Sequence, residues 1–153
     1  EEVYKAVGTV KAGRMGLGEL QQMCRVAIDG PGVCAGLATA NSMHCLAEVL
    51  GMALPGNAPI RADGPRLHAL ADAAGARIVE LVNEDLRPRA ILTPAALRNA
   101  VRFAVATGCS VNVMRHLIAI AVEAECPVDV IAEFERAADL VPMLTRIRPN
   151  GPD

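Results

Sequence analysis

Residues 30–50 read GPGVCAGLATANSMHCLAEVL, and this stretch determines how the rest of the chain is interpreted. Three glycines and a proline surround Cys34 near its start, which is typical of a loop that leads into a helix. An apolar stripe at helical spacing follows, formed by Leu37, Ala40, Met43, Ala47 and Leu50. Because glycine often ends a helix, Gly51 predicts a helix that stops near Leu50.

Similar periodic stretches, separated by glycine and proline, occur along the whole chain. They predict about seven helices, over 1–12, 18–27, 37–50, 65–86, from 93 to the turn at Gly108, over 111–124, and from 129 to just before Pro142. The expected N-cap residues are Thr93, Ser110 and Asp129. At most short strands are expected, near 89–92 and 144–147. The predicted fold class is therefore mainly α.

The composition favours close packing of helices. The chain of 153 residues holds 27 alanines but only one Tyr, two Phe and no Trp. Small side chains fill a core only where backbones approach closely, which helices allow. Gly75, in the middle of the long predicted helix, costs about 1 kcal/mol relative to alanine, and a close packing partner would explain it. Length alone suggests one domain with a sizeable core.

Charge and hydropathy exclude two classes of partner. The formal net charge is −2, and the chain has neither a basic block nor the aromatic residues that bind nucleic acids. The most apolar stretch, Val111 to Val122, is interrupted by three polar residues, so no segment should cross a membrane. Five cysteines form an odd set without CxxC spacing, and no secretory signal is found. We therefore expect a cytoplasmic protein with reduced thiols.

Cys34 is the strongest candidate for chemistry on the residues alone. The N-terminus of the following helix carries partial positive charge, which lowers the pKa of a nearby thiol. Such a thiolate can be a nucleophile or a metal ligand, but a free cysteine is as often a small buried hydrophobe. Cys45 lies eleven residues on, roughly 16 Å away along a continuous helix. The two thiols are therefore not expected to share one metal centre.

The remaining thiols, histidines and carboxylates give weaker signals. Cys24 lies at a core position of its predicted helix and Cys126 in a turn, where structural roles are expected, while Cys109 is the only other thiol in a site-like loop. The three histidines lie on different predicted helices without zinc-site spacing. His116 is kept as a candidate because it follows the Cys109 loop by two turns. The carboxylates are scattered over predicted helix surfaces and are expected to be solvated.

Two motifs, in order along the chain, resemble one enzyme family. The first is GPGVCAGLATANSM at 30–43, continued by EVLGMALPGN at 48–57, and the second is GCSVNVMRHLIAIA at 108–121, preceded by RPRAILT at 87–93. They are similar to the iron-sulfur cysteine segment and to the later glycine-serine-threonine-asparagine loop of the dihydroxy-acid dehydratase and phosphogluconate dehydratase family. The TANSM run is closest to dihydroxy-acid dehydratases.

The resemblance implies a place in a larger enzyme. Residues 1–153 would be a single segment of the N-terminal iron-sulfur-binding domain of a longer α/β dehydratase, expected to be a homo-oligomer. The implied reaction removes water from a 2,3-dihydroxy carboxylate, either a dihydroxy acid or a sugar acid, and gives a 2-keto acid. An iron-sulfur cluster acts as Lewis acid on the C3 hydroxyl, a base removes the C2 proton, and Mg²⁺ holds the carboxylate.

The resemblance also implies the site residues. Cys34 matches a cluster-ligand cysteine, and the site-lining residues would be Thr39, Asn41, Ser110, Asn112 and His116. The other cluster cysteines and the Mg²⁺ ligands would lie upstream of this segment and the base downstream, so no catalytic residue is identified here. The chain departs from the family pattern at several positions: Ile28-Asp29 replaces Cys-Pro, Cys109 a glycine, Val111 a threonine and Arg115 an apolar residue.

Three hypotheses remain open at this point. The chain is an internal segment of a hydro-lyase, inactive alone; or a divergent, non-catalytic helical scaffold or interaction module of the same family; or a stand-alone thiol-based binding or redox protein that uses Cys34 and Cys109. The first is favoured, because two separated motifs in the right order rarely arise by chance.

Overall fold

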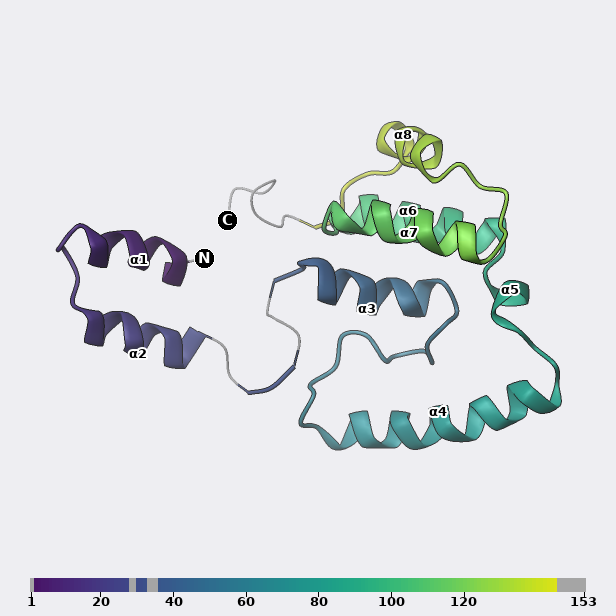
Figure 1. The fold of residues 1–153 in the computed structure, drawn as a ribbon, viewed down its shortest axis with the longest axis horizontal. Helices are drawn as coiled ribbons and strands as arrows, with labels where there is room; N and C mark the ends of the chain where they lie inside the picture. The colour runs from purple at the N-terminus through teal and green to yellow at the C-terminus, as the bar shows by residue number, and fades with distance from the viewer. Residues whose placement is uncertain (1, 28–29, 33–35, 146–153) are drawn as a thin grey trace.

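The chain folds into helices joined by turns (Figure 1). The computed structural model describes residues 2–27, 30–32 and 36–145. The helices are α1 (Glu2–Lys11), α2 (Leu17–Ala27), α3 (Thr39–Val49), α4 (Pro65–Asn83), α5 (Pro88–Ile91), α6 (Pro94–Thr107), α7 (Asn112–Glu123) and α8 (Val130–Leu140). No strand is present within these ranges. The mainly α prediction is confirmed, and α5 is the helix that the sequence did not predict.

No strand forms at 89–92, where at most a short one was expected. Residues 88–91 form the single turn α5, because Pro88 occupies the first helical position and holds φ in the helical range. No strand is seen over Leu144 and Thr145 either, and the rest of 144–147 lies outside the described residues. The Leu144 amide instead donates to the carbonyl of Ala106, at 2.7 Å.

Two of the three predicted N-caps are confirmed. Thr93 Oγ1 accepts the Ala96 amide at 3.2 Å, and Asp129 Oδ1 accepts the Ala132 amide at 3.1 Å. The third residue, Ser110, also accepts an amide of the first turn: its Oγ lies 3.4 Å from the Asn112 amide, although α7 begins one residue later than predicted, with Val111 before it. The same hydroxyl contacts α3, as described below.

Helix α6 lies at the centre of the packed part of the molecule. It packs against α3, α7 and α8, with α3 and α8 on different sides (Figure 1). The buried core consists of Leu46 and Leu50 of α3, Leu97, Ala100, Val101 and Ala104 of α6, Val113, Leu117 and Ala121 of α7, and Val130 and Ala137 of α8. Four of these residues are alanines, which agrees with the close helix packing that the composition predicts.

The helices outside this core bury little. Helices α1 and α2 pack against each other, and α2 has no buried residue. Cys24 on α2 is exposed, so its predicted core position was wrong. Helix α4 also has no buried residue, and Ile78 on its predicted apolar stripe is 58% exposed. Within the described residues, no helix is both long and apolar enough to span a bilayer.

Gly75 has no packing partner in the described structure. A Cβ atom built on this residue would meet nothing within 4 Å, so the close partner expected from the sequence is absent from the described residues. Gly75→Ala should therefore stabilise α4 by about 1 kcal/mol. The change is measured as the shift in the urea midpoint of unfolding.

Gly108→Ala is the matched comparison for Gly75→Ala. Gly108 ends α6 at φ 62°, a left-handed conformation in which a Cβ is strained. The same substitution should therefore lower the midpoint here. Equal effects at the two glycines would contradict the assignment of their backbone roles.

Candidate functional site

The described part of the candidate site lies where the N-terminus of α3 meets the turn between α6 and α7. Cys34, the predicted cluster ligand, lies outside the described residues, as do its neighbours at 33 and 35. The chain is described again from Gly36, three residues before α3 begins at Thr39. The site is therefore built here from the residues that directly follow the cysteine loop.

The buried hydroxyl of Ser42 joins the two segments. Ser42 is 0% exposed, its Oγ donates to the Leu37 carbonyl at 3.1 Å, and the same Oγ accepts the Ser110 amide at 3.0 Å. A serine hydroxyl can donate one hydrogen bond and accept others, so it satisfies both backbone groups. Ser42 was part of the first motif but was not predicted as a site residue.

Thr39, Ser110 and Asn112 form a polar cluster beside this anchor. The Asn112 side-chain amide donates to Thr39 Oγ1 at 2.8 Å, and the Thr39 and Ser110 hydroxyls lie 3.1 Å apart at hydrogen-bond distance. The structure thus brings the predicted site residue Thr39 together with two others, Ser110 and Asn112, which lie 71 and 73 positions further along the chain. They present hydroxyl and amide groups, which bind polar substrates and do not themselves transfer protons near neutral pH.

Asn41 provides an acceptor without a donor. Its Oδ1 atom is buried, and no described residue donates a hydrogen bond to it. A buried acceptor left without a partner costs about 1–3 kcal/mol, so native structures rarely keep one without a reason. Asn41 lies in the first turn of α3, two residues after Thr39. Its amide oxygen is therefore available to a donor outside the described residues.

His116 is one helical turn beyond Asn112. The two residues are four positions apart on α7 and so share a face of that helix. His116 is half-buried, and no hydrogen bond links its ring to Thr39, Ser110 or Asn112. The polar cluster is therefore complete without His116.

The Cys45 thiol of α3 is not activated. Burial raises the pKa of the Cys45 thiol above its ordinary value, and the nearby Cys109 thiol and Glu48 carboxylate raise it further. Cys109 Sγ lies 3.3 Å from the Thr107 hydroxyl. A raised pKa favours the protonated thiol, which is a poor nucleophile and a poor metal ligand. Cys45 is thus a packing residue of α3.

Glu48 closes the loop after α3, contrary to the prediction that the carboxylates are solvated. Its two oxygens accept the amides of Gly56 and Ala58, at 2.7 and 2.9 Å. These bonds, that to Gly56 first, hold the pKa of Glu48 below its ordinary value. The spacing of eight to ten residues gave no periodic signal, which is why sequence reasoning missed this contact.

The described residues do not form a metal centre by themselves. Over the described ranges, no group of three or more His, Cys, Asp or Glu side chains is placed to hold a metal ion. Any cluster bound through Cys34 would need ligands from elsewhere. Fold and site together define a helical segment in which the hydroxyl and amide groups of Thr39, Ser110 and Asn112 form a polar wall, a few residues after Cys34 in the chain.

Sequence comparison gives this segment its family. The whole chain, residues 1–153, matches the family described as "Dihydroxy-acid/6-phosphogluconate dehydratase N-terminal". The chain belongs to this family, as the two motifs predicted.

Curated relatives agree with this assignment. The chain is 48% identical over 151 residues to a dihydroxy-acid dehydratase of Syntrophobacter fumaroxidans, 46% identical to one of Acetivibrio thermocellus, and 43% identical to one of Dehalococcoides mccartyi. These alignments cover 97–98% of the chain. The chain spans 27% of the length of each of these relatives.

Ser42→Ala should separate the two segments of the site. The substitution leaves the partly buried Ser110 amide and Leu37 carbonyl without this partner, which costs about 1–3 kcal/mol. The free energy of unfolding from urea titration measures this loss. Thr9→Ala on α1 removes an exposed hydroxyl bonded only within its own helix and should change little; equal losses would contradict the anchoring role of Ser42.

Glu48 should make stability depend on acid pH. Since its folded pKa lies below the ordinary 4.5, the contribution is complete well above that pH and is lost as pH falls through the folded pKa. Glu48→Gln keeps only one acceptor and should lower the urea midpoint at pH 7 but not at pH 2. Glu19→Gln, on the exposed face of α2, is the control. If Glu48→Gln lowered the urea midpoint as much at pH 2 as at pH 7, the role assigned to the Glu48 carboxylate would be refuted.

Proposed function

We propose that the chain is one segment of a hydro-lyase that removes water from a 2,3-dihydroxy carboxylate and yields a 2-keto acid. In this reaction the C2 proton and the C3 hydroxyl leave as water, and the resulting enol tautomerises to the keto acid. The segment belongs to the N-terminal iron-sulfur-binding domain, which in turn is part of a longer α/β enzyme. Dihydroxy acids are preferred over sugar acids as substrates, because the relatives carry the dihydroxy-acid name.

The polar cluster that follows the cysteine loop carries this proposal. Thr39 and Asn112 are linked at 2.8 Å, and both Thr39 and Ser42 lie within eight residues of Cys34 in the chain. The two motifs that resemble the family thus meet at one place. A scaffold without catalysis would have no need for a buried, unpaired acceptor such as Asn41 Oδ1 in the same turn of α3 as Thr39.

Cys34 is the residue of this chain that would hold an iron-sulfur cluster. The unfilled Asn41 acceptor and the hydroxyl groups of the wall are the features that fit a polar ligand next to such a group. When bound, the cluster would supply a Lewis acid for the departing hydroxyl. The remaining cluster ligands, the Mg²⁺ ligands and the base come from outside this chain.

The chain's own residues orient the substrate in this proposal. The hydroxyls of Thr39 and Ser110 and the side-chain amide of Asn112 can bond a substrate oxygen. Because Ser42 holds Ser110 against α3, these groups keep one fixed spacing. Fixed positions reduce the entropy lost when the substrate is aligned for reaction.

The setting of the enzyme is also part of the proposal. The four cysteines within the described part of the chain are free thiols, in keeping with a reducing, cytoplasmic compartment. The exposed apolar residues of α4, Ile78, Val79 and Val82, suit contact with other parts of a homo-oligomeric enzyme. We propose no nucleic-acid or membrane partner, since no basic block is present.

Iron analysis of the full-length protein tests this function. The protein is purified without oxygen, and iron, acid-labile sulfide and visible absorption are measured. Cys34→Ala should lose most of the iron and the colour, whereas Cys24→Ala, at an exposed position of α2, should keep both. A colourless wild-type protein without iron would overturn the proposal and favour the scaffold hypothesis.

A further inference from the structure

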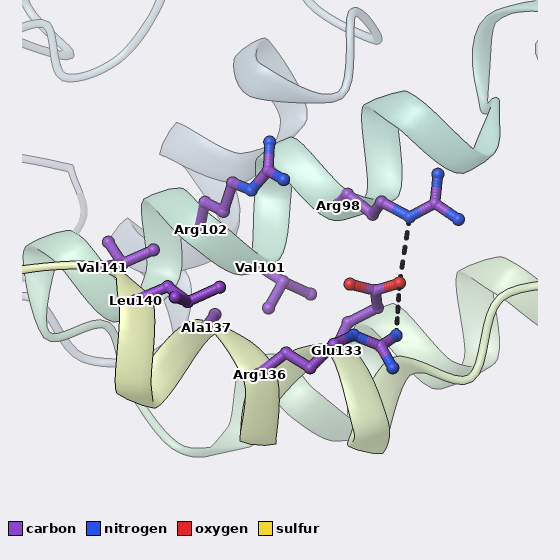
Figure 2. Close-up of a pocket in the computed structure, with 8 residues that line it drawn as sticks. All are labelled: Arg98, Val101, Arg102, Glu133, Arg136, Ala137, Leu140 and Val141. Carbon is purple, nitrogen blue, oxygen red and sulfur yellow. Dashed lines mark hydrogen bonds and ion pairs between the residues drawn. The ribbon is translucent and has the colours of Figure 1, made fainter.

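A charged groove lies between α6 and α8, outside the candidate site. It has a volume of about 300 Å³ and is lined by Arg98, Val101 and Arg102 of α6, by Glu133, Arg136, Ala137 and Leu140 of α8, and by Val141 (Figure 2). Cavities of this size hold small molecules. Helix α3, which carries Thr39 and Ser42, packs on α6 as well but lies on a different side of it from α8 (Figure 1). The groove is therefore separate from the polar cluster.

One carboxylate in the groove is shared by two guanidinium groups. Glu133 Oε1 lies 2.7 Å from a nitrogen of Arg136 and 3.0 Å from Nε of Arg98, and the Glu133 side chain is 13% exposed. Bonds from Arg136 and Arg98 hold the pKa of Glu133 below its ordinary value, so it stays ionised at neutral pH. Three arginines against one glutamate leave the groove with a net charge of about +2, in a chain whose total is −2.

Arg102 is the arginine of this groove that has no acidic partner. It follows Arg98 by one turn on α6, and in Figure 2 no dashed line joins its guanidinium to Glu133. Among the residues that the structure describes, no carboxylate lies within ion-pair distance of Arg102. A guanidinium left in this state has five donors free for a planar anion.

The rest of the groove is apolar. Val101 and Ala137 are almost completely buried and form the base of an apolar wall, whose open surface comes from Leu140, which is 80% exposed, and from the half-buried Val141. An anion with no apolar part, such as inorganic phosphate, would leave this wall in contact with water. A carboxylate with a short aliphatic chain matches both parts, because its head can pair with Arg102 in a bidentate manner and its chain can cover the wall.

We propose that the groove between α6 and α8 is a binding site for a small aliphatic carboxylate, with Arg102 as its anion-binding residue. The site is independent of the proposed dehydratase reaction, since it shares no residue with the cluster at Thr39 and Ser110. Because α6 contacts both α3 and α8, a ligand here binds one of the helices that support the candidate site.

Calorimetric titration of the full-length protein at constant ionic strength tests this proposal. Isobutyrate is the probe, and isobutyramide, which has the same shape without the charge, and inorganic phosphate are the comparison ligands. We expect saturable binding of isobutyrate and at least tenfold weaker binding of both others. Two outcomes would overturn the proposal. One is the absence of saturable isobutyrate binding, which would mean that another part of the protein fills the groove; the other is binding of phosphate as tight as that of isobutyrate.

Substitution at Arg102 locates the site. Arg102→Gln should weaken isobutyrate binding at least tenfold. Arg102→Lys keeps the charge but loses the planar guanidinium, so its affinity should lie between those of the wild type and Arg102→Gln. Arg14→Gln, at an exposed arginine between α1 and α2, is the matched control and should bind as the wild type. Because Arg102 is exposed, its variants should melt as the wild type does without ligand. If Arg102→Gln binds isobutyrate as tightly as the wild type, the ligand binds elsewhere and the proposal is overturned. The iron content of the protein tests the dehydratase proposal separately.

Discussion

The hydroxyl of Ser42 is the contact on which the candidate site depends. It is the one side chain of α3 that bonds both its own N-terminal loop, through Leu37, and the turn before α7, through Ser110. Without it, two partly buried backbone groups would lose their partner at the point where the two motifs meet. Thr39 and Asn112 can then hold a 2.8 Å bond because the backbones beneath them are already joined. The positions of Thr39, Ser110 and Asn112 in the polar wall thus depend on the buried Ser42 hydroxyl.

The alanine-rich core makes this junction possible. Ala100 and Ala104 on α6 and Ala121 on α7 are each at most 4% exposed, so the helix backbones approach one another closely. Close approach lets short side chains such as serine and threonine bridge neighbouring segments, where a core of large rings would hold them apart. The same central helix leaves its other side to α8, and the charged groove opens there. One helix therefore supports two chemically different surfaces.

Helix positions could be predicted well because their signals are local. Thr93 and Asp129 bond amides three residues away, and Pro65 and Pro94 stand at helix starts as proline's fixed φ requires. Predictions were incomplete where a side chain had more than one partner within reach. Ser110 was expected to cap α7, and its hydroxyl also contacts Thr39, while Glu48 was expected in solvent but accepts two loop amides. Gly75, expected to meet a neighbour, meets none in the described structure.

The sequence by itself determined the helical class, the family and the candidate residues, because helical spacing and sequence motifs depend on residues that are close together in the chain. Only the tertiary structure decided which of those residues meet: Thr39, Ser110 and Asn112 do, and His116 is not bonded to them. It also decided that Arg98 and Arg136 share Glu133 while Arg102 stays unpaired within the described residues. Such pairings depend on how helices far apart in the chain pack together, and packing over long separations leaves no periodic trace in the sequence.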